Sequence, residues 1–325
     1  MKLDAYDKKI LEILVSNSRE PVTKIAKKVR LKRETVNYKI NRLIDAGLIK
    51  EFNMILNRKK LGLSQDVVFL ELANLQKDTE NQILKYLKNN KYMSWIGPAA
   101  GRWSMVFDII RPEKIELDEV IRELLIKFGK YIDDYVILRL QDSDYFTHKF
   151  LGIPQPTLKK TQINSTEMRL DFKDYKILSL LNTNAKISCV KISESVSLTP
   201  NGISKRIKNL EKTGIILGYT ISIDWKKLGY EWYGLQLRQT KFSKEIDAKL
   251  VSYFTKNEKI TVYNKYLGGQ WDYDISTLIK NSGELRDLIH DFRTEFSNEA
   301  KITDVFIVLE ETTSYKFPKG VFNED

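Results

Sequence analysis

Cysteine, histidine, proline and glycine are all scarce in this chain of 325 residues. Cys189 is the single cysteine, which excludes an intramolecular disulfide and fits a reducing compartment. His148 and His290 are the only histidines, so no clustered ligand set for a structural zinc ion is expected. No stretch approaches the roughly 20 apolar residues of a membrane span. The sequence therefore predicts a cytoplasmic protein with no metal and no membrane contact.

Catalytic motifs are missing as well. The chain has no Gly-rich phosphate loop, no nucleophile elbow and no metal-binding helix. Adjacent acids such as Asp133-Asp134 stand beside predicted strands, where solvated strand ends are more common than catalytic pairs. We therefore expect no enzyme and no bound cofactor.

Apolar residues, in contrast, make up 42% of the chain, enough for packed cores. At roughly 100–150 residues per domain, the length predicts two to four domains. The formal net charge of +11 favours polyanionic partners such as nucleic acid or an anionic membrane.

An internal repeat divides the chain into two halves, here called copy one and copy two. Residues 1–63 align without gaps on residues 168–230, with about a third of the positions identical. A looser match continues beyond them. The clearest matching stretches are Leu3-Asp4 with Leu170-Asp171, Lys59-Lys60-Leu61-Gly62 with Lys226-Lys227-Leu228-Gly229, and Gly101-Arg102-Trp103-Ser104 with Gly269-Gln270-Trp271-Asp272. The chain therefore contains a duplicated two-part unit.

Charge and composition set the predicted boundaries. The segments are 1–63, 64–150, a polar, proline-containing linker over 151–167, 168–230 and 231–325. Their formal charges are about +9, −2, +1, +6 and −3. The excess positive charge thus lies in the first part of each copy, a distribution for which membrane binding or general solubility gives no reason.

Each basic module shows three short helical patterns followed by a strand. In copy one, Asp4 can cap the first helix, Pro21 opens the second, and the third begins near Lys32 and ends at Gly47. The apolar stretch Leu48–Leu56 then predicts a wing strand. Copy two repeats the plan, with Thr199-Pro200 as a cap and first helical residue that copy one lacks. This order predicts a winged helix-turn-helix in each copy.

The third helix of such a module buries one face and presents the other to the DNA groove. With its apolar residues placed inward, the polar side chains become candidates for base and phosphate contacts. The alternative is a solvated helix face, but the same pattern occurs twice with its own basic excess. The predicted DNA-binding residues are Lys32, Arg33, Glu34, Asn37, Tyr38, Lys39, Asn41 and Arg42 in copy one, and Thr199, Asn201, Ser204, Lys205, Arg206 and Lys208 in copy two.

The stretch LTPNGISKRIKNLEKTGIILGYTISID of copy two closely resembles the recognition helix and wing of the Lrp/AsnC (leucine-responsive, feast/famine) regulators. Copy one resembles a diverged version. The resemblance implies that each winged helix precedes a ferredoxin-like βαββαβ domain that dimerises and often binds an amino acid or another small effector. The expected fold is therefore α+β, with two winged helix-turn-helix domains alternating with two ferredoxin-like domains.

In that family a Gly-x-x-Asp hairpin lies near the effector cleft. The resemblance therefore implies a candidate effector site, with a tight hairpin that packs a tryptophan as the structural alternative. Copy two keeps the aspartate, whereas copy one has serine. The residues are Gly101, Arg102, Trp103 and Ser104 in copy one, and Gly269, Gln270, Trp271 and Asp272 in copy two.

These patterns together predict a sequence-specific regulator that binds double-stranded DNA. We expect the α+β domains to pair within one chain as a pseudo-dimer, or to assemble homo-oligomers. One alternative is a DNA-compacting assembly protein without an effector. Another is an enzyme that resembles the sirohaem decarboxylases, although their histidine has no counterpart in the strand and hairpin regions here.

Overall fold

The computed structural model describes residues 3–73, 76–146, 148–153, 170–312 and 317–322. The chain forms two compact units, each built from both copies. The first, here called the helical unit, comprises residues 1–63, 155–228 and 314–325. The second, the barrel unit, comprises residues 64–154 and 229–313. Most of the predicted linker, from residue 154 on, lies outside the described residues.

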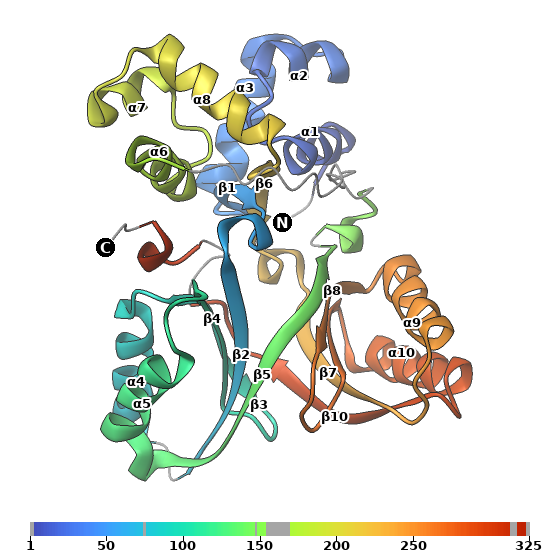
Figure 1. Ribbon diagram of the computed structural model, residues 1–325. Helices are drawn as coiled ribbons and strands as arrows, with labels where there is room; N and C mark the ends of the chain where they lie inside the picture. Colours follow the sequence, from blue (N-terminus) through green and yellow to red (C-terminus); the bar gives the residue numbers. More distant parts are fainter. Residues whose placement is uncertain (1–2, 74–75, 147, 154–169, 313–316, 323–325) are drawn as a thin grey trace. The chain divides into compact units, whose positions relative to one another are not determined.

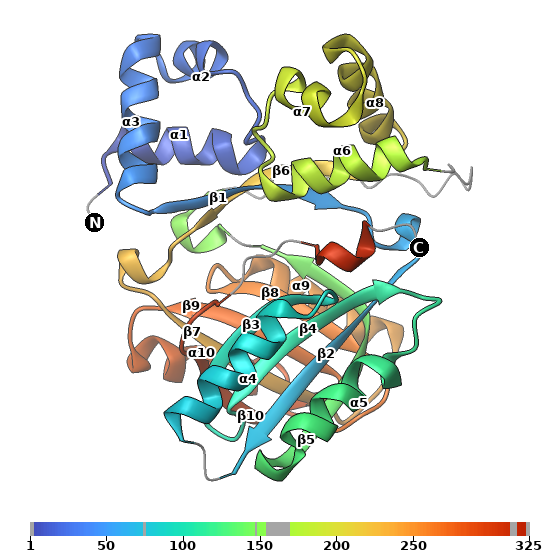
Figure 2. The ribbon, with the colours of Figure 1, turned by 90° about the vertical axis from the view of Figure 1, so that its left-hand side faces the viewer.

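The helical unit contains a three-helix module and a strand from each copy (Figure 2). The strands β1 and β6 pair with each other as an antiparallel two-stranded sheet, in which Phe52 is opposite Ile221. Each predicted wing strand therefore forms, but its partner is the strand of the other copy. The elements are α1 (Ala5–Ser16), α2 (Val22–Val29), α3 (Arg33–Asp45), β1 (Ile49–Leu56) and η1 (Lys59–Leu61), then α6 (Phe172–Thr183), α7 (Cys189–Val196), α8 (Pro200–Lys212), β6 (Ile216–Ile223), η4 (Lys226–Leu228) and η5 (Lys319–Val321).

The barrel unit contains two βαββαβ halves. In copy one these are β2 (Leu63–Leu72), α4 (Lys77–Asn89), β3 (Met93–Ala100), β4 (Met105–Pro112), α5 (Leu117–Phe128) and β5 (Ile132–Tyr145), with 3-10 turns η2 (Gly129–Tyr131) and η3 (Lys149–Leu151). In copy two they are β7 (Glu231–Gln239), α9 (Lys244–Lys256), β8 (Ile260–Tyr266), β9 (Tyr273–Ile279), α10 (Ser282–Glu295) and β10 (Ala300–Val308). This element order confirms the predicted fold class.

The eight strands close into one barrel in the order β10-β3-β4-β2-β5-β8-β9-β7. Two junctions join the copies: β5 pairs with β8, where Tyr145 is opposite Val262, and β3 pairs with β10, where Ala99 is opposite Val308. Helices α4 and α5 cover the outer face of one half, and α9 and α10 cover that of the other (Figure 1). The two ferredoxin-like halves thus pair within a single chain.

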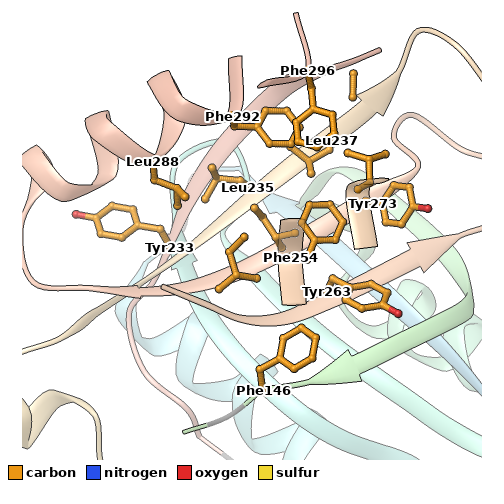
Figure 3. Packing of buried hydrophobic residues seen from close by; sticks show 14 of the residues in the cluster. Phe146, Tyr233, Leu235, Leu237, Phe254, Tyr263, Tyr273, Leu288, Phe292 and Phe296 are labelled. Carbon is orange, nitrogen blue, oxygen red and sulfur yellow. The ribbon is translucent and has the colours of Figure 1, made fainter. Parts of the chain in front are cut away.

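A hydrophobic core lies between each half-barrel and its helices. In copy two, Phe254 of α9 packs its ring 5.6 Å from those of both Tyr263 and Tyr273 (Figure 3). Leu235 and Leu237 lie two residues apart on β7, so both face the same helices. No helix among the described residues is long and apolar enough to cross a membrane.

Candidate nucleic-acid interface

Each module of the helical unit has helix-turn-helix geometry with well-defined ends. Asp4 and Asp171 cap α1 and α6 through reciprocal capping boxes with Asp7 and Asp174. The turn between the second and third helices contains a left-handed residue in both copies, Arg30 with φ 58° and Ser197 with φ 54°. Gly47 (φ 64°) ends the recognition helix α3 as predicted, because glycine adopts this conformation without strain.

The recognition helix α3 buries Val36, Ile40 and Leu43. The opposite face carries the exposed residues of the predicted set, and Tyr38 is 66% exposed. Lys32 stands at the N-cap position without a side-chain cap. The exposed predicted residues are Lys32, Arg33, Glu34, Asn37, Tyr38 and Asn41.

Lys39 and Arg42, also predicted to bind DNA, contact the capping-box acids of α1. Lys39 Nζ lies 2.6 Å from Asp4 Oδ2 and 3.1 Å from Asp7 Oδ1, and Arg42 Nη2 lies 2.6 Å from Asp7 Oδ2. Asp7 is fully buried. The hydrogen bond that Lys39 donates to Asp4 lowers the pKa of Asp4 to about 2 and raises the pKa of Lys39. The ion pairs of these two basic side chains therefore hold α3 against α1.

In copy two as well, some of the predicted residues contact other parts of the module and others are exposed. Thr199 Oγ1 accepts a hydrogen bond from the Gly202 N–H, so this predicted residue caps α8. Arg206 Nη1 lies 2.9 Å from Asp171 Oδ2 and 2.7 Å from the buried Asp174 Oδ1. Asn201, Lys205 and Lys208 are exposed on the outer face of α8, and Ser204 is half-buried there.

The predicted basic residues therefore fall into two groups. Lys39, Arg42 and Arg206 are paired with the capping-box acids of the first helix of their module, α1 or α6. Lys32, Arg33, Lys205 and Lys208 form no ion pair with any part of the chain that the structure describes. Unpaired exposed cations are the ones available to DNA phosphates. All these DNA contacts remain predictions.

Sequence reasoning overlooked the basic side chains of α2. Its inward residues are Ile25, Ala26 and Val29, so Lys24, Lys27 and Lys28 are exposed on the other side. Lys24 and Lys28 lie 3.8 and 3.2 Å from Glu20 carboxylate oxygens. Lys27 and Arg30, the latter in the tight turn, form no such ion pair among the described residues. The same helical periodicity that placed α2 could have identified them.

The candidate effector hairpins meet inside the barrel unit. Trp103 and Trp271 are buried, with ring centroids 5.9 Å apart, and both pack against Phe69. Arg102, exposed, donates a hydrogen bond of 3.3 Å to Gln270 Oε1 across the two copies. Gly101 and Gly269 have φ values of 126° and 110°, which suit the turns. The two hairpins thus form one contact between the copies.

Ser104 and Asp272 accept matching backbone hydrogen bonds, and Asp272 Oδ2 also lies 3.7 Å from Arg238 Nε. Ser104 Oγ accepts a hydrogen bond of 3.1 Å from the Leu72 N–H, and Asp272 Oδ2 accepts one of 2.8 Å from the Gln239 N–H. Leu72 and Gln239 are matching positions of the repeat. Serine in copy one therefore preserves this backbone contact. Effector binding at these hairpins remains a prediction.

Both histidines belong to the barrel unit. His148 is buried in the barrel unit, whereas His290 is exposed on α10. In the described part of the chain, no group of three or more Cys, His, Asp and Glu side chains is arranged to hold a metal ion.

A family model described as winged helix-turn-helix DNA-binding matches residues 3–50 and 170–216. An HTH-type transcriptional regulator of Pyrococcus furiosus is 32% identical over 128 residues, covering 38% of this chain and 83% of that protein. The HTH-type transcriptional regulator LrpB of Bacillus subtilis is 40% identical over 65 residues, 20% of this chain and 44% of LrpB. A crystal structure of the siroheme decarboxylase NirDL has a TM-score of 0.65 at 12% identity, covering 98% of this chain and 96% of that one.

Fold and surface together define a tandem winged helix-turn-helix protein with paired ferredoxin-like domains. The chain belongs to the Lrp/AsnC family of HTH-type transcriptional regulators, as its resemblance to that family predicted. The likeness to NirDL concerns the fold alone.

Proposed function

We propose that this protein regulates transcription by binding duplex DNA through α3 and α8. One observation carries the proposal: each recognition helix presents exposed basic side chains without an ion pair among the described residues, Lys32 and Arg33 on one and Lys205 and Lys208 on the other. Such side chains can neutralise phosphates while neighbouring polar groups contact base edges. A cytoplasmic location would bring the protein to its DNA.

The two recognition helices differ in their exposed residues, so we propose that they bind unlike half-sites. Glu34, Asn37 and Asn41 on α3 face solvent at positions that Asn201, Ser204 and Lys208 hold on α8. Different donor and acceptor sets favour different base pairs. The preferred operator would then be an imperfect palindrome.

Affinity that depends on phosphate contacts falls steeply with salt. The test is a titration of genomic promoter fragments at two salt concentrations, followed by selection of bound sequences from random duplex DNA. We expect salt-sensitive binding and enrichment of an asymmetric site. Absence of DNA binding, or an affinity that does not change with salt, would contradict the proposal that this protein is a DNA-binding regulator.

We propose that an amino acid or another small molecule acts at the barrel unit, near the hairpins of residues 101–104 and 269–272. Repeating the selection with and without an amino-acid mixture tests it, and an unchanged set of bound sequences and affinities would contradict it. Homo-oligomers built through the barrel unit can be measured by analytical ultracentrifugation in the same samples.

Two other functions make different predictions. A DNA-compacting protein would shorten long duplexes without enriching any sequence. A decarboxylase, which only the shared fold with NirDL favours, would release CO₂ from a sirohaem substrate whether or not DNA is present. Selection without enrichment would support the first, and CO₂ release would support the second.

A further inference from the structure

The two Lys-Lys-Leu-Gly turns of the repeat join the recognition helices across the copies. Lys60 Nζ, in η1 of copy one, donates a hydrogen bond of 2.6 Å to the Thr213 carbonyl at the end of α8. Lys227 Nζ, in η4 of copy two, donates to the Ala46 carbonyl at the end of α3. Lys60 matches Lys227 in the repeat, and Ala46 matches Thr213. Each copy therefore donates a lysine hydrogen bond to the end of the other copy's recognition helix.

A lysine at this place suits the end of a helix. The last carbonyls of an α-helix have no partner within it, and the helix dipole places partial negative charge there. Ala46 and Thr213 are the C-cap residues of α3 and α8. An ammonium group can both donate to these carbonyls and stabilise that charge.

Gly47 leaves the space that Lys227 uses. A Cβ atom at Gly47 would lie 2.7 Å from Lys227 Nζ, closer than van der Waals contact allows. The same residue has a φ of 64°, which side chains rarely adopt. Glycine thus both ends α3 and admits the lysine of the other copy.

The strands bring each turn to the opposite helix. The Asn57 N–H, after β1, donates 2.9 Å to the Ile215 carbonyl of copy two. The Asp224 N–H, after β6, donates 2.8 Å to the Leu48 carbonyl of copy one. Ile215 and Leu48 lie at the starts of the opposite wing strands, just beyond the recognition helices.

We propose that Lys60 and Lys227 are positioning residues that hold α3 and α8 at one fixed separation, and so select one spacing between the DNA half-sites. A helix-turn-helix pair reads two half-sites at a separation set by the protein. Each lysine ties one module to the end of the other module's recognition helix. The consequence for DNA rests on the proposed function, whereas the consequence for helix separation does not.

The first test uses the free protein. Nitroxide labels are placed at Asp45→Cys and Lys212→Cys, exposed matching positions at the ends of α3 and α8, with Cys189→Ala to remove the native thiol. We expect the double variant Lys60→Met, Lys227→Met to broaden the distance distribution measured by pulsed electron resonance. The control is Lys59→Met, Lys226→Met, which removes the same charge from the exposed lysines of the same turns. Identical distributions in both variants would overturn the proposal, provided that circular dichroism shows both to be folded.

The second test uses duplexes whose selected half-sites are separated by stepwise longer and shorter spacers. Since each charge-assisted hydrogen bond favours one arrangement, the Lys60→Met, Lys227→Met variant should lose about tenfold in discrimination between the preferred and other spacings. The control variant should keep the spacing profile of the unsubstituted protein. A uniform loss of affinity at all spacings with a reduced salt slope would show instead that these lysines contact phosphates, which overturns the proposal. Absence of DNA binding by the unsubstituted protein would reject the proposed function but leave the distance measurement to judge helix positioning.

Discussion

Two adjacent residues of α8, Lys205 and Arg206, allow a sharp test of the division between DNA-contacting and structural cations. Lys205 is exposed and has no ion pair among the described residues. Arg206 is one-third exposed and binds both carboxylates of the capping box on α6. Replacing each by alanine should therefore affect different properties.

The structure sets the size of the stability effect. Arg206→Ala leaves the carboxylate of Asp174, only 7% exposed, without its cation. Breaking a buried ion pair costs about 3–5 kcal/mol, but the partial exposure of Arg206 and of Asp171 reduces this to about 2 kcal/mol. Lys205→Ala removes no contact of this kind, so its effect should stay within about 0.5 kcal/mol.

For DNA binding, Lys205→Ala should have the larger effect and Arg206→Ala the smaller one, the reverse of their effects on stability. Loss of one phosphate contact lowers the slope of log K against log salt by about 0.9, which we expect for Lys205→Ala. Arg206→Ala should keep the slope of the unsubstituted protein under conditions where it is folded. Urea unfolding and duplex titrations at several salt concentrations measure the two effects. The division into two groups of cations is wrong if Arg206→Ala is as stable as the unsubstituted protein but has a smaller slope of log K against log salt. Arg206 would then contact DNA.

Two further predictions concern the barrel unit. Asp272→Ser should nearly preserve stability because Ser104 makes the equivalent hydrogen bond in copy one, whereas Ser104→Ala should cost about 1 kcal/mol in urea unfolding; equal effects would contradict the matched roles. Burial raises the pKa of Asp274 from 3.8 to about 7. The folded state then binds its proton more tightly than the unfolded state, so the free energy of unfolding should fall as pH rises between those values. Asp274→Asn should remove this fall, and parallel pH profiles for the two proteins would refute the assignment.

Local pattern was enough to predict the three helices and the wing strand of each helix-turn-helix module. The capping Asp4, the Thr199-Pro200 pair and the terminating Gly47 lie where the sequence placed them. The full length of β5, Ile132–Tyr145, could not be predicted in the same way. Its last residues, from Leu140 on, pair with β8 of copy two. A contact between segments so distant in sequence leaves no periodic signal in either of them.

The paired cations could not be recognised for a similar reason. A helical projection of α3 shows Lys39 and Arg42 on the polar side, where they look available to DNA. Their partner Asp7 belongs to another helix and is buried by packing that a single helix does not reveal. The repeat of Asp7 as Asp174 was the one signal in the sequence that could have indicated a shared structural role.

The recognition helices α3 and α8 share their structural positions but differ in their exposed ones. The matching residues Lys39 and Arg206 keep their charge and both bind the acids of a capping box. Exposed positions differ instead, for example Glu34 against Asn201. Because the two helices belong to one chain, each should contact its own half-site. In duplex selection, Asn37→Ala should relax base preference in one half-site and Asn201→Ala in the other, each by about 1–3 kcal/mol for a lost base contact. Changes in the same half-site, or equal changes in both, would show that the helices are interchangeable.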